Sequence, residues 1–567
     1  MKKLLPLILV LFLAVISDLY PQDRVDAVES FTPSRVMLFV KTSRVKNAVV
    51  SLKFVVDNLL SPEHAEKFNK KKNDIKNRLG FDPMDIESLK NAGIDVNRTA
   101  SLAIYPKGSR GEERILLFIP VMDDRTFPLK FVEVLKRISA NNNADIYPAI
   151  TEYNGHTMYQ IRRDVFTAAF DGVFIIASAG DLLRSVIDTK VNNAGYLALD
   201  PMYADYIAKT KKNYDLRAFA TRDFLKDIMK KEEKKNTEPP PSKDEKKGPA
   251  DSAFNDAVMT NVRYVADVAQ NQPSVRSELE KLSVGPSPFN AVDYAFIGGS
   301  VKPTEIDIDL AARFNNASAP VNTFLDIMKT GSSGKSLYVK NATTFAFISL
   351  DFNKIEELCK NATAGCAYYS SIKEQIREEM GIDFDRDIVP SYSGVLNIFA
   401  GQPRGAGGGY VFYFPIDDPA QGKKAWEKSS AYLAGKFKNT ERYGTAPIGG
   451  VKSFWYVDAK NNRNYVACDR RGLYLGNDRE LMATVLAGKE IGDRSVKDDV
   501  ISRLGANVFF LAHIKKESYF GTLLTLFTYR AKGLSAVINK MTDLYVTGEK
   551  VDGFISLNVK TRLMKRQ

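Results

Sequence analysis

The chain repeats itself at a long interval, and this internal similarity restricts its fold more than any other feature. Short blocks recur in the same order, about 295 to 299 positions later. The matched blocks are Leu38–Lys41 with Leu337–Lys340, Phe118–Val121 with Tyr413–Ile416, Tyr153–Gly155 with Ile448–Gly450, and Leu182, Leu183, Val186 and Ile187 with Leu481, Met482, Val485 and Leu486. So steady a period predicts two homologous units with one topology.

Each unit is expected to combine short buried strands with single amphipathic helices. Ile115–Ile119 and Tyr410–Phe414 are apolar and aromatic runs, typical of buried strands. After each run comes an acidic pair and then a proline, Pro128 or Pro419, of the kind that begins a helix. Few spacings fit a parallel strand–helix–strand unit. We therefore predict an α+β fold: two duplicated units, each an antiparallel sheet with helices packed on one face.

The two predicted units differ in length. The first spans residues 31–320 and the second spans residues 335–567. The first contains a charged insertion, 229–251, which is rich in lysine and glutamate and includes the prolines Pro239–Pro241. Such a stretch has too few apolar side chains to offset the entropy of ordering, so we predict a disordered surface insertion.

Residues 1–17 have the pattern of a secretory signal peptide. Lys2 and Lys3 precede an apolar run from Leu4 to Ile16, and Ser17 is a small residue at the expected cut. The run is too short to cross about 30 Å of hydrocarbon as a helix. An uncleaved anchor is the alternative. We predict a protein exported to the periplasm or the cell surface, with no transmembrane helix after signal cleavage.

The formal net charge of +12 is most simply interpreted as a solvated basic surface, and an anionic partner is the other interpretation. An exported protein is not expected to meet nucleic acid, so the candidate partners are anionic lipid, lipopolysaccharide or a cell-wall polymer, or another envelope protein. Lys70, Lys71 and Lys72 form a compact basic cluster and are the candidate residues for binding an anionic surface. The alternative is that these lysines are merely solvated.

The cysteines and histidines exclude a large disulfide framework and give no metal-binding pattern. Cys359 and Cys366 are close enough in sequence to pair as a disulfide in an oxidising compartment. Cys468 lies in an expected strand and is predicted to be a small buried hydrophobe. The three histidines are far apart in sequence, so no metal site is predicted.

Motifs that would indicate catalysis or cofactor binding are incomplete. Gly334-Lys335-Ser336 resembles the end of a phosphate-binding loop, but Lys329 stands where the first glycine is needed. Gly405–Gly409 lacks the glycine spacing of a dinucleotide site and is predicted to be a hairpin tip. Asp123-Asp124 and Asp417-Asp418 precede expected helices, so we interpret them as caps and not as acid–base pairs. No catalytic residue, metal ligand or cofactor is assigned.

One block resembles a known family. The run Ala168–Ser178, followed by Leu182-Leu183 and Leu199-Asp200-Pro201, is similar to a family of exported bacterial envelope proteins catalogued only as a domain of unknown function. Gly93-Ile94-Asp95 and Gly381-Ile382-Asp383 fit the same family pattern. The resemblance implies an envelope protein and no known chemistry, hence no site residues. The charged insertion and Arg470-Arg471 depart from that pattern.

These observations favour a non-enzymatic exported protein. We expect a binding or structural module for an anionic or apolar envelope ligand, or for a protein partner. The alternative is an exported hydrolase whose site is assembled between the two copies from residues distant in sequence. A deep cleft with converging carboxylates would favour the enzyme, whereas a continuous apolar groove would favour ligand carriage.

Overall fold

The structure of the chain is a computed structural model. It describes residues 27–564 except 59, 61, 110, 141–148, 211–213, 228–290, 316–324, 332–335, 340, 341, 352, 355–372, 375, 376, 379, 380, 382, 393, 405, 406, 437–441, 458–460, 491–505 and 518–540. The expected signal peptide 1–17, the charged insertion 229–251, and both Cys359 and Cys366 lie outside the described residues.

Twenty strands form one antiparallel sheet. The strands of the first half are β1 (Leu38–Thr42), β2 (Ser101–Tyr105), β3 (Arg114–Pro120), β4 (Ala149–Tyr153), β5 (His156–Arg162), β6 (Val165–Phe170), β7 (Val173–Ala177), β8 (Leu216–Thr221), β9 (Val292–Lys302) and β10 (Glu305–Phe314). Those of the second half are β12 (Thr344–Ser349), β13 (Val395–Arg404), β14 (Gly407–Pro415), β15 (Tyr443–Ile448), β16 (Val451–Val457), β17 (Arg463–Cys468), β18 (Gly472–Gly476), β20 (Val508–Lys515), β21 (Met541–Val551) and β22 (Phe554–Leu563). The short strands β11 (Leu337–Tyr338) and β19 (Lys489–Glu490) form a separate two-stranded ladder.

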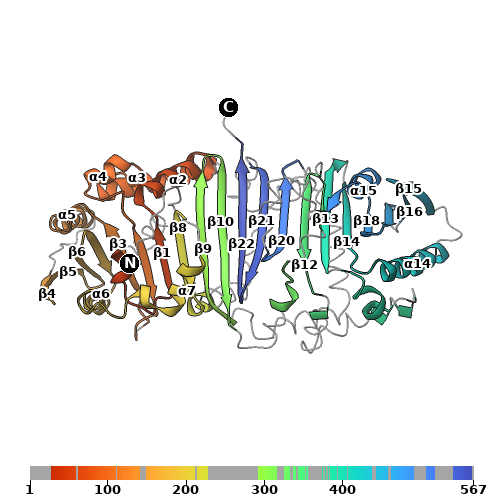
Figure 1. Ribbon diagram of the computed structural model, residues 1–567. Coiled ribbons are helices and arrows are strands. Elements are labelled where there is room, and N and C mark those ends of the chain that lie inside the picture. Colours follow the sequence, from red (N-terminus) through yellow and green to blue (C-terminus); the bar gives the residue numbers. More distant parts are fainter. Residues whose placement is uncertain are drawn as a thin grey trace, which may run out of the picture.

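The two halves of the sheet have the same order of strand pairing. The first half runs β4-β5-β6-β7-β3-β2-β1-β8-β9-β10. The second runs β15-β16-β17-β18-β14-β13-β12-β20-β21-β22. β10 pairs with β22 over nine residue pairs and joins the halves edge to edge (Figure 1). This order holds for the strands that the structure describes. The duplication and the boundaries of the two units remain predictions.

The helices lie on both faces of the sheet. In the first half they are α2 (Val45–Asn58), α3 (Pro62–Leu79), α4 (Ile86–Asn91), α5 (Phe127–Ala140), α6 (Gly180–Asn192) and α7 (Pro201–Lys209), with the 3-10 turns η1 (Ala27–Ser30) and η2 (Leu197–Leu199). In the second half they are α14 (Pro419–Lys436), α15 (Arg479–Leu486) and the π-helical turn η6 (Phe384–Ile388). Helices α2, α4 and α5 pack on one face, which we name the α2 face, whereas α6 and α7 pack on the opposite face, the α6 face.

The predicted fold class is therefore wrong on two points. The α+β prediction placed an antiparallel sheet in each unit, with helices on one face, but the chain builds a single continuous sheet covered on both faces. β7 shows the physical reason. Phe174 and Ile175 are adjacent, so they point to opposite faces, and both are fully buried. Unbroken apolar runs of this kind require cover on each side of the sheet.

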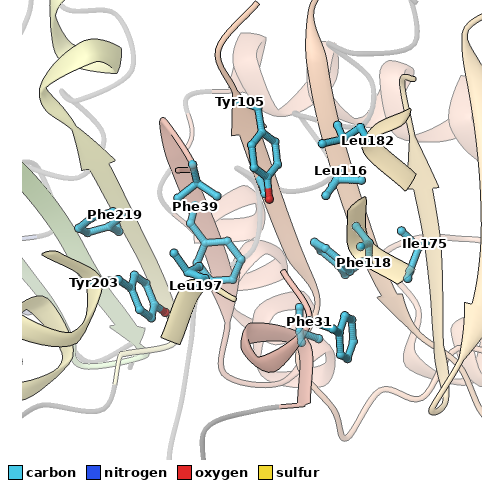
Figure 2. Packing of buried hydrophobic residues seen from close by; sticks show 14 of the residues in the cluster. Phe31, Phe39, Tyr105, Leu116, Phe118, Ile175, Leu182, Leu197, Tyr203 and Phe219 are labelled. Atoms are coloured by element: carbon cyan, nitrogen blue, oxygen red, sulfur yellow. The ribbon is translucent and has the colours of Figure 1, made fainter. Parts of the chain in front are cut away.

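The largest core lies on the α6 face of the first half. Figure 2 shows Phe31, Phe118 and Ile175 beside one another, with Tyr203 and Phe219 at the α7 end of the cluster. Phe39 meets Tyr203 edge to face, with ring centroids 5.7 Å apart. Aromatic rings in this geometry add to the free energy gained from burying their apolar area.

The second half has an equivalent core, built by α15. Met482 and Val485 are fully buried against a cluster that includes Tyr413 and Tyr474, whose rings stack at 4.8 Å. On the opposite face Trp426 of α14 stacks on Phe454 at 5.0 Å. Helices thus cover both faces of this half as well.

The matched sequence blocks correspond in position except for one. Phe118–Val121 and Tyr413–Ile416 fall at the ends of β3 and β14, which occupy the same place in the strand order. Leu337–Lys340, matched by sequence to the β1 segment, instead begins with β11, and β12 takes the place equivalent to β1. A block of three apolar or aromatic residues and a lysine fits many buried strands, so its similarity alone could not fix the pairing.

The predicted helix cap is confirmed at Asp418 and only in part at Asp123-Asp124. Asp418 accepts a hydrogen bond from the backbone N–H of Ala420 at 2.9 Å, directly before Pro419 opens α14. Asp123 accepts from the Thr126 hydroxyl and from the Arg125 N–H, and these bonds lower the pKa of its carboxyl. Asp123 thus closes the turn that leads into α5, whereas Asp124 accepts instead from the Gly172 N–H, in the turn between β6 and β7, at 3.1 Å.

Candidate functional site

The junction of the two halves carries polar groups on the α6 face. Asp309 of β10 is almost fully buried, and it accepts hydrogen bonds from the Tyr214 hydroxyl and from Asn558 Nδ2, the latter at 2.8 Å. Asn558 also donates to Asp307. Burial is the main cause that raises the pKa of Tyr214, and the Asp309 carboxylate is the next. The hydroxyl therefore stays protonated and donates. These polar groups are hydrogen-bond partners of one another across β10 and β22. We therefore interpret them as structural and not as a binding site.

A histidine–aspartate pair lies two strands away. His513 Nε2 is 2.9 Å from Asp543 Oδ1, and the imidazole stacks on Tyr545 with an interplanar angle of 2°. The hydrogen bond from His513 is the main cause that lowers the pKa of Asp543. Because the ring is fixed between a carboxylate and an aromatic face, the pair links β20 to β21 in the manner of a cross-strand contact.

A second buried polar group, in the first half, has no sequence signal. Glu29 of η1 is 3% exposed and forms an ion pair with Lys41 Nζ at 2.9 Å. The Tyr203 hydroxyl of α7 also donates to Glu29. The three side chains tie η1, β1 and α7 together over the core. Glu29 and Lys41 lie in different elements, so no spacing in the sequence reveals the pair.

The α2 face carries an apolar row across the junction. The residues that lie opposite one another in register are Val40, Ala218, Ile297, Leu310, Leu557, Gly548, Phe510 and Ile348, on eight successive strands. Three of these, Ile297, Leu310 and Leu557, are 50%, 39% and 37% exposed, and we name them the central patch. Exposed apolar side chains that are contiguous in this way mark contact surfaces more often than scattered ones do.

Helix α2 covers the end of the strands next to this patch. Phe54 and Val55 pack against Val301, Ile306 and Leu563, and the Ser51 hydroxyl donates to the Val301 carbonyl at 3.1 Å. Ile297 of the central patch lies four residues before Val301 on β9, a distance of about 13 Å at 3.3 Å per residue. At that distance from the α2 contact its side chain is exposed. The patch is therefore the exposed continuation of a surface that α2 buries.

The candidate lysines are on α3, which packs beside α2 and α5 on the same face of the molecule. Lys70 and Lys71 are exposed, as the charge prediction requires for a binding role. Lys72 is half-buried, with its Nζ 4.0 Å from Asp82. The structure thus leaves Lys70 and Lys71 available to an external anion and gives Lys72 an internal partner.

A surface pocket of about 660 Å³ lies beside the start of α15, lined in part by Tyr465, Asn477 and Arg479. Asp478 caps this helix, accepting from the N–H groups of Glu480 and Leu481 at 2.9 and 3.0 Å. The polar groups at the helix start are therefore engaged by the chain itself.

Cys468 lies at the end of β17 and is half-buried, with a free thiol. Burial raises the pKa of this thiol to about 12, so it is protonated at neutral pH and unreactive. The described residues contain no group of three or more His, Cys, Asp or Glu side chains placed to hold a metal ion.

Within the part of the chain that the structure describes, no helix has both the length and the apolar character needed to cross a membrane.

Comparisons with known proteins return structural matches of low similarity. No family model and no curated protein matches the chain. Three crystal forms of TP0453 match by structure: form IV with a TM-score of 0.25, 8% identity and coverage of 51% of this chain and 81% of that chain; form III with 0.24, 9%, 56% and 91%; form I with 0.25, 10%, 56% and 89%. No property is carried over from them, and the resemblance to an exported family stays a prediction.

Proposed function

We propose that this chain is an exported, non-enzymatic envelope protein that binds anionic lipid surfaces through its α2 face. The observation that carries the proposal is the central patch. Ile297, Leu310 and Leu557 lie side by side on three paired strands, and all three side chains are exposed. A lipid surface supplies apolar contact to such a patch over a broad, flat area.

Charge complementarity supports an anionic lipid over a neutral one. Lys70 and Lys71 are exposed on α3, which packs beside α2 and α5, the helices of the face that carries the patch. Each lysine near an anionic surface contributes about 1 kcal/mol, and the contribution falls within a Debye length of about 10 Å. Partial burial of three apolar side chains adds a few kcal/mol. The sum describes a reversible association that weakens in high salt.

The test is co-sedimentation with vesicles of phosphatidylcholine alone and with an equal mixture of phosphatidylcholine and phosphatidylglycerol. The double variant Lys70→Glu/Lys71→Glu removes about 2 kcal/mol of attraction and adds the repulsion of two carboxylates, so its partition to the anionic vesicles should fall by about 30-fold or more. The control is Arg184→Glu/Lys209→Glu, which changes the net charge equally but lies in α6 and α7, on the α6 face.

The apolar contribution has its own matched pair of variants. Leu310→Asn/Leu557→Asn should weaken binding by about tenfold, since it removes roughly 1.4 kcal/mol of apolar contact. The control Met202→Asn/Ile207→Asn alters α7 residues of nearly equal exposure, 38% and 37%, on the opposite face. Equal partition to both kinds of vesicle, or equal losses in the test and control variants, would reject the proposal.

A further inference from the structure

The continuous sheet ends in two outer strands, β4 and β15. Among the described residues β4 pairs with β5 alone, and β15 pairs with β16 alone. The two strands occupy the same place in the pairing order of their halves. An outer strand presents one row of backbone N–H and C=O groups away from its sheet, and these groups can pair with another strand.

The hairpin turns decide which residues present those groups. Asn154 and Gly155 have φ values of 48° and 77°, and Gly449 and Gly450 have 55° and 80°, as two-residue type I′ turns require. The residues that flank such a turn bond to each other, and the backbone groups then alternate inward and outward along the strand. In β4 the outward groups are therefore those of Ile150 and Glu152. In β15 they are those of Tyr443, Thr445 and Pro447.

Pro447 and Glu152 occupy the same position in their hairpins, since each lies opposite the second residue of the returning strand. Proline has no N–H, so Pro447 removes an outward donor and blocks that edge to strand addition. Glu152 retains its donor. β4 also exposes its side chains, and Ile150 is 64% exposed. Strand addition is thus opposed by a proline at one edge of the sheet and unopposed at the matching position of the other.

We propose that β4 pairs antiparallel with β4 of a second copy of this chain. The register is centred on Thr151, so Ile150 of each copy lies opposite Glu152 of the other. Each of these two pairs forms two backbone hydrogen bonds, which gives four in all. Thr151 meets its own counterpart, a favourable cross-strand pair. The Glu152 carboxylate accepts from the Thr157 hydroxyl at 2.6 Å within its own hairpin, and in this register it does not face the other Glu152.

The blocked edge determines the size of the assembly. Pairing of β4 with β15 of another copy would run head to tail and would not close. Pro447 opposes that contact, whereas pairing of β4 with β4 is isologous and closes at two copies. The proposal concerns assembly and is independent of lipid binding, because β4 lies at the outer edge of the sheet and the central patch lies at its middle.

The experiment compares wild type, Glu152→Pro and Glu152→Thr by sedimentation velocity over a range of protein concentrations. Glu152→Pro gives β4 the residue that β15 has at this position, and an outer strand tolerates it because only an outward N–H is lost. Glu152→Thr removes the same carboxylate but keeps the donor. Wild type and Glu152→Thr should sediment as dimers at concentrations where Glu152→Pro is a monomer with an unchanged circular dichroism spectrum.

Hydrogen exchange provides a second measurement that does not depend on a variant. The amides of Ile150 and Glu152 should become protected as the wild-type concentration rises, while the Thr445 amide of β15 stays unprotected. A wild-type chain that is monomeric throughout, a Glu152→Pro variant that dimerises like wild type, or capture of some other strand by β4 in place of a second copy would overturn the proposal.

Discussion

The two halves of the sheet share an order of strands but differ in what they bury. On the α6 face of the first half Lys41 lies opposite Ser101, and Lys41 pairs with the buried Glu29. At the equivalent place in the second half Phe347 lies opposite Asn397. One half thus has a buried ion pair where the other has an aromatic ring. Backbone pairing and apolar alternation thus maintain this topology, while individual buried contacts are exchangeable.

A second difference lies beside the junction. Phe219 of β8 pairs with Phe296 of β9, and both belong to an apolar aromatic cluster. The equivalent pair in the second half is His513 with Tyr545, and His513 also bonds to Asp543. The second half therefore has an acid-sensitive contact at a position where the first half has none.

The largest effect is expected at the buried ion pair. Lys41→Met leaves the Glu29 carboxylate buried without its ammonium partner, which should lower the free energy of unfolding by about 3 kcal/mol. The double variant Glu29→Gln/Lys41→Met removes both charges and should recover most of this loss. Urea denaturation gives both values. A single variant as stable as wild type, or a double variant no better than the single, would show that the ion pair does not maintain the first half.

Matched truncations in the two helices test whether the halves are equivalent in packing. Val186 of α6 and Val485 of α15 are both fully buried at corresponding places. Val186→Ala and Val485→Ala should each cost about 2 kcal/mol, the sum of lost burial and residual cavity. The measurement is again urea denaturation. A loss in one half several times that in the other would contradict equivalent packing.

The smallest effect is the pH dependence at Asp543. Its pKa is lowered in the folded chain, chiefly by the hydrogen bond from His513, so its contribution to stability is present above the pKa of an unfolded aspartate, about 4. That contribution is lost as the pH falls through the lower, folded value. Wild type should therefore lose about 1 kcal/mol more than Asp543→Asn between pH 6 and pH 3, which is part of the roughly 1.5–3 kcal/mol that a hydrogen bond to a charged group contributes. Equal losses would show that Asp543 is not the source of acid sensitivity.

Much of the local structure could be predicted from the sequence. The Asp418 cap and the turns at Asn154-Gly155 and Gly449-Gly450 follow from short patterns with one conformational solution. The joining of the halves through β10 and β22 could not be predicted, because a strand with alternating apolar side chains does not specify its neighbour. Cover on both faces was indicated by the unbroken run in β7, but the prediction of helices on one face overlooked it.

The candidate site was predicted only in part. Lys70 and Lys71 could be found because adjacent charges are visible in the sequence, and the structure places them exposed on α3. The central patch could not be found, since Ile297, Leu310 and Leu557 come from strands whose pairing the sequence leaves open. Residues from distant strands form a surface only once the register is known.

The most direct test of the account compares the two faces of the sheet at a lipid surface. A spin label at Leu310→Cys reports on the α2 face and one at Ile207→Cys reports on the α6 face, in a chain whose three native cysteines are replaced by serine. With anionic vesicles, the label at 310 should gain contact with oxygen and lose contact with a water-soluble nickel complex, while the label at 207 stays in water. The same change at both positions, or a change at 207 alone, would contradict binding through the α2 face.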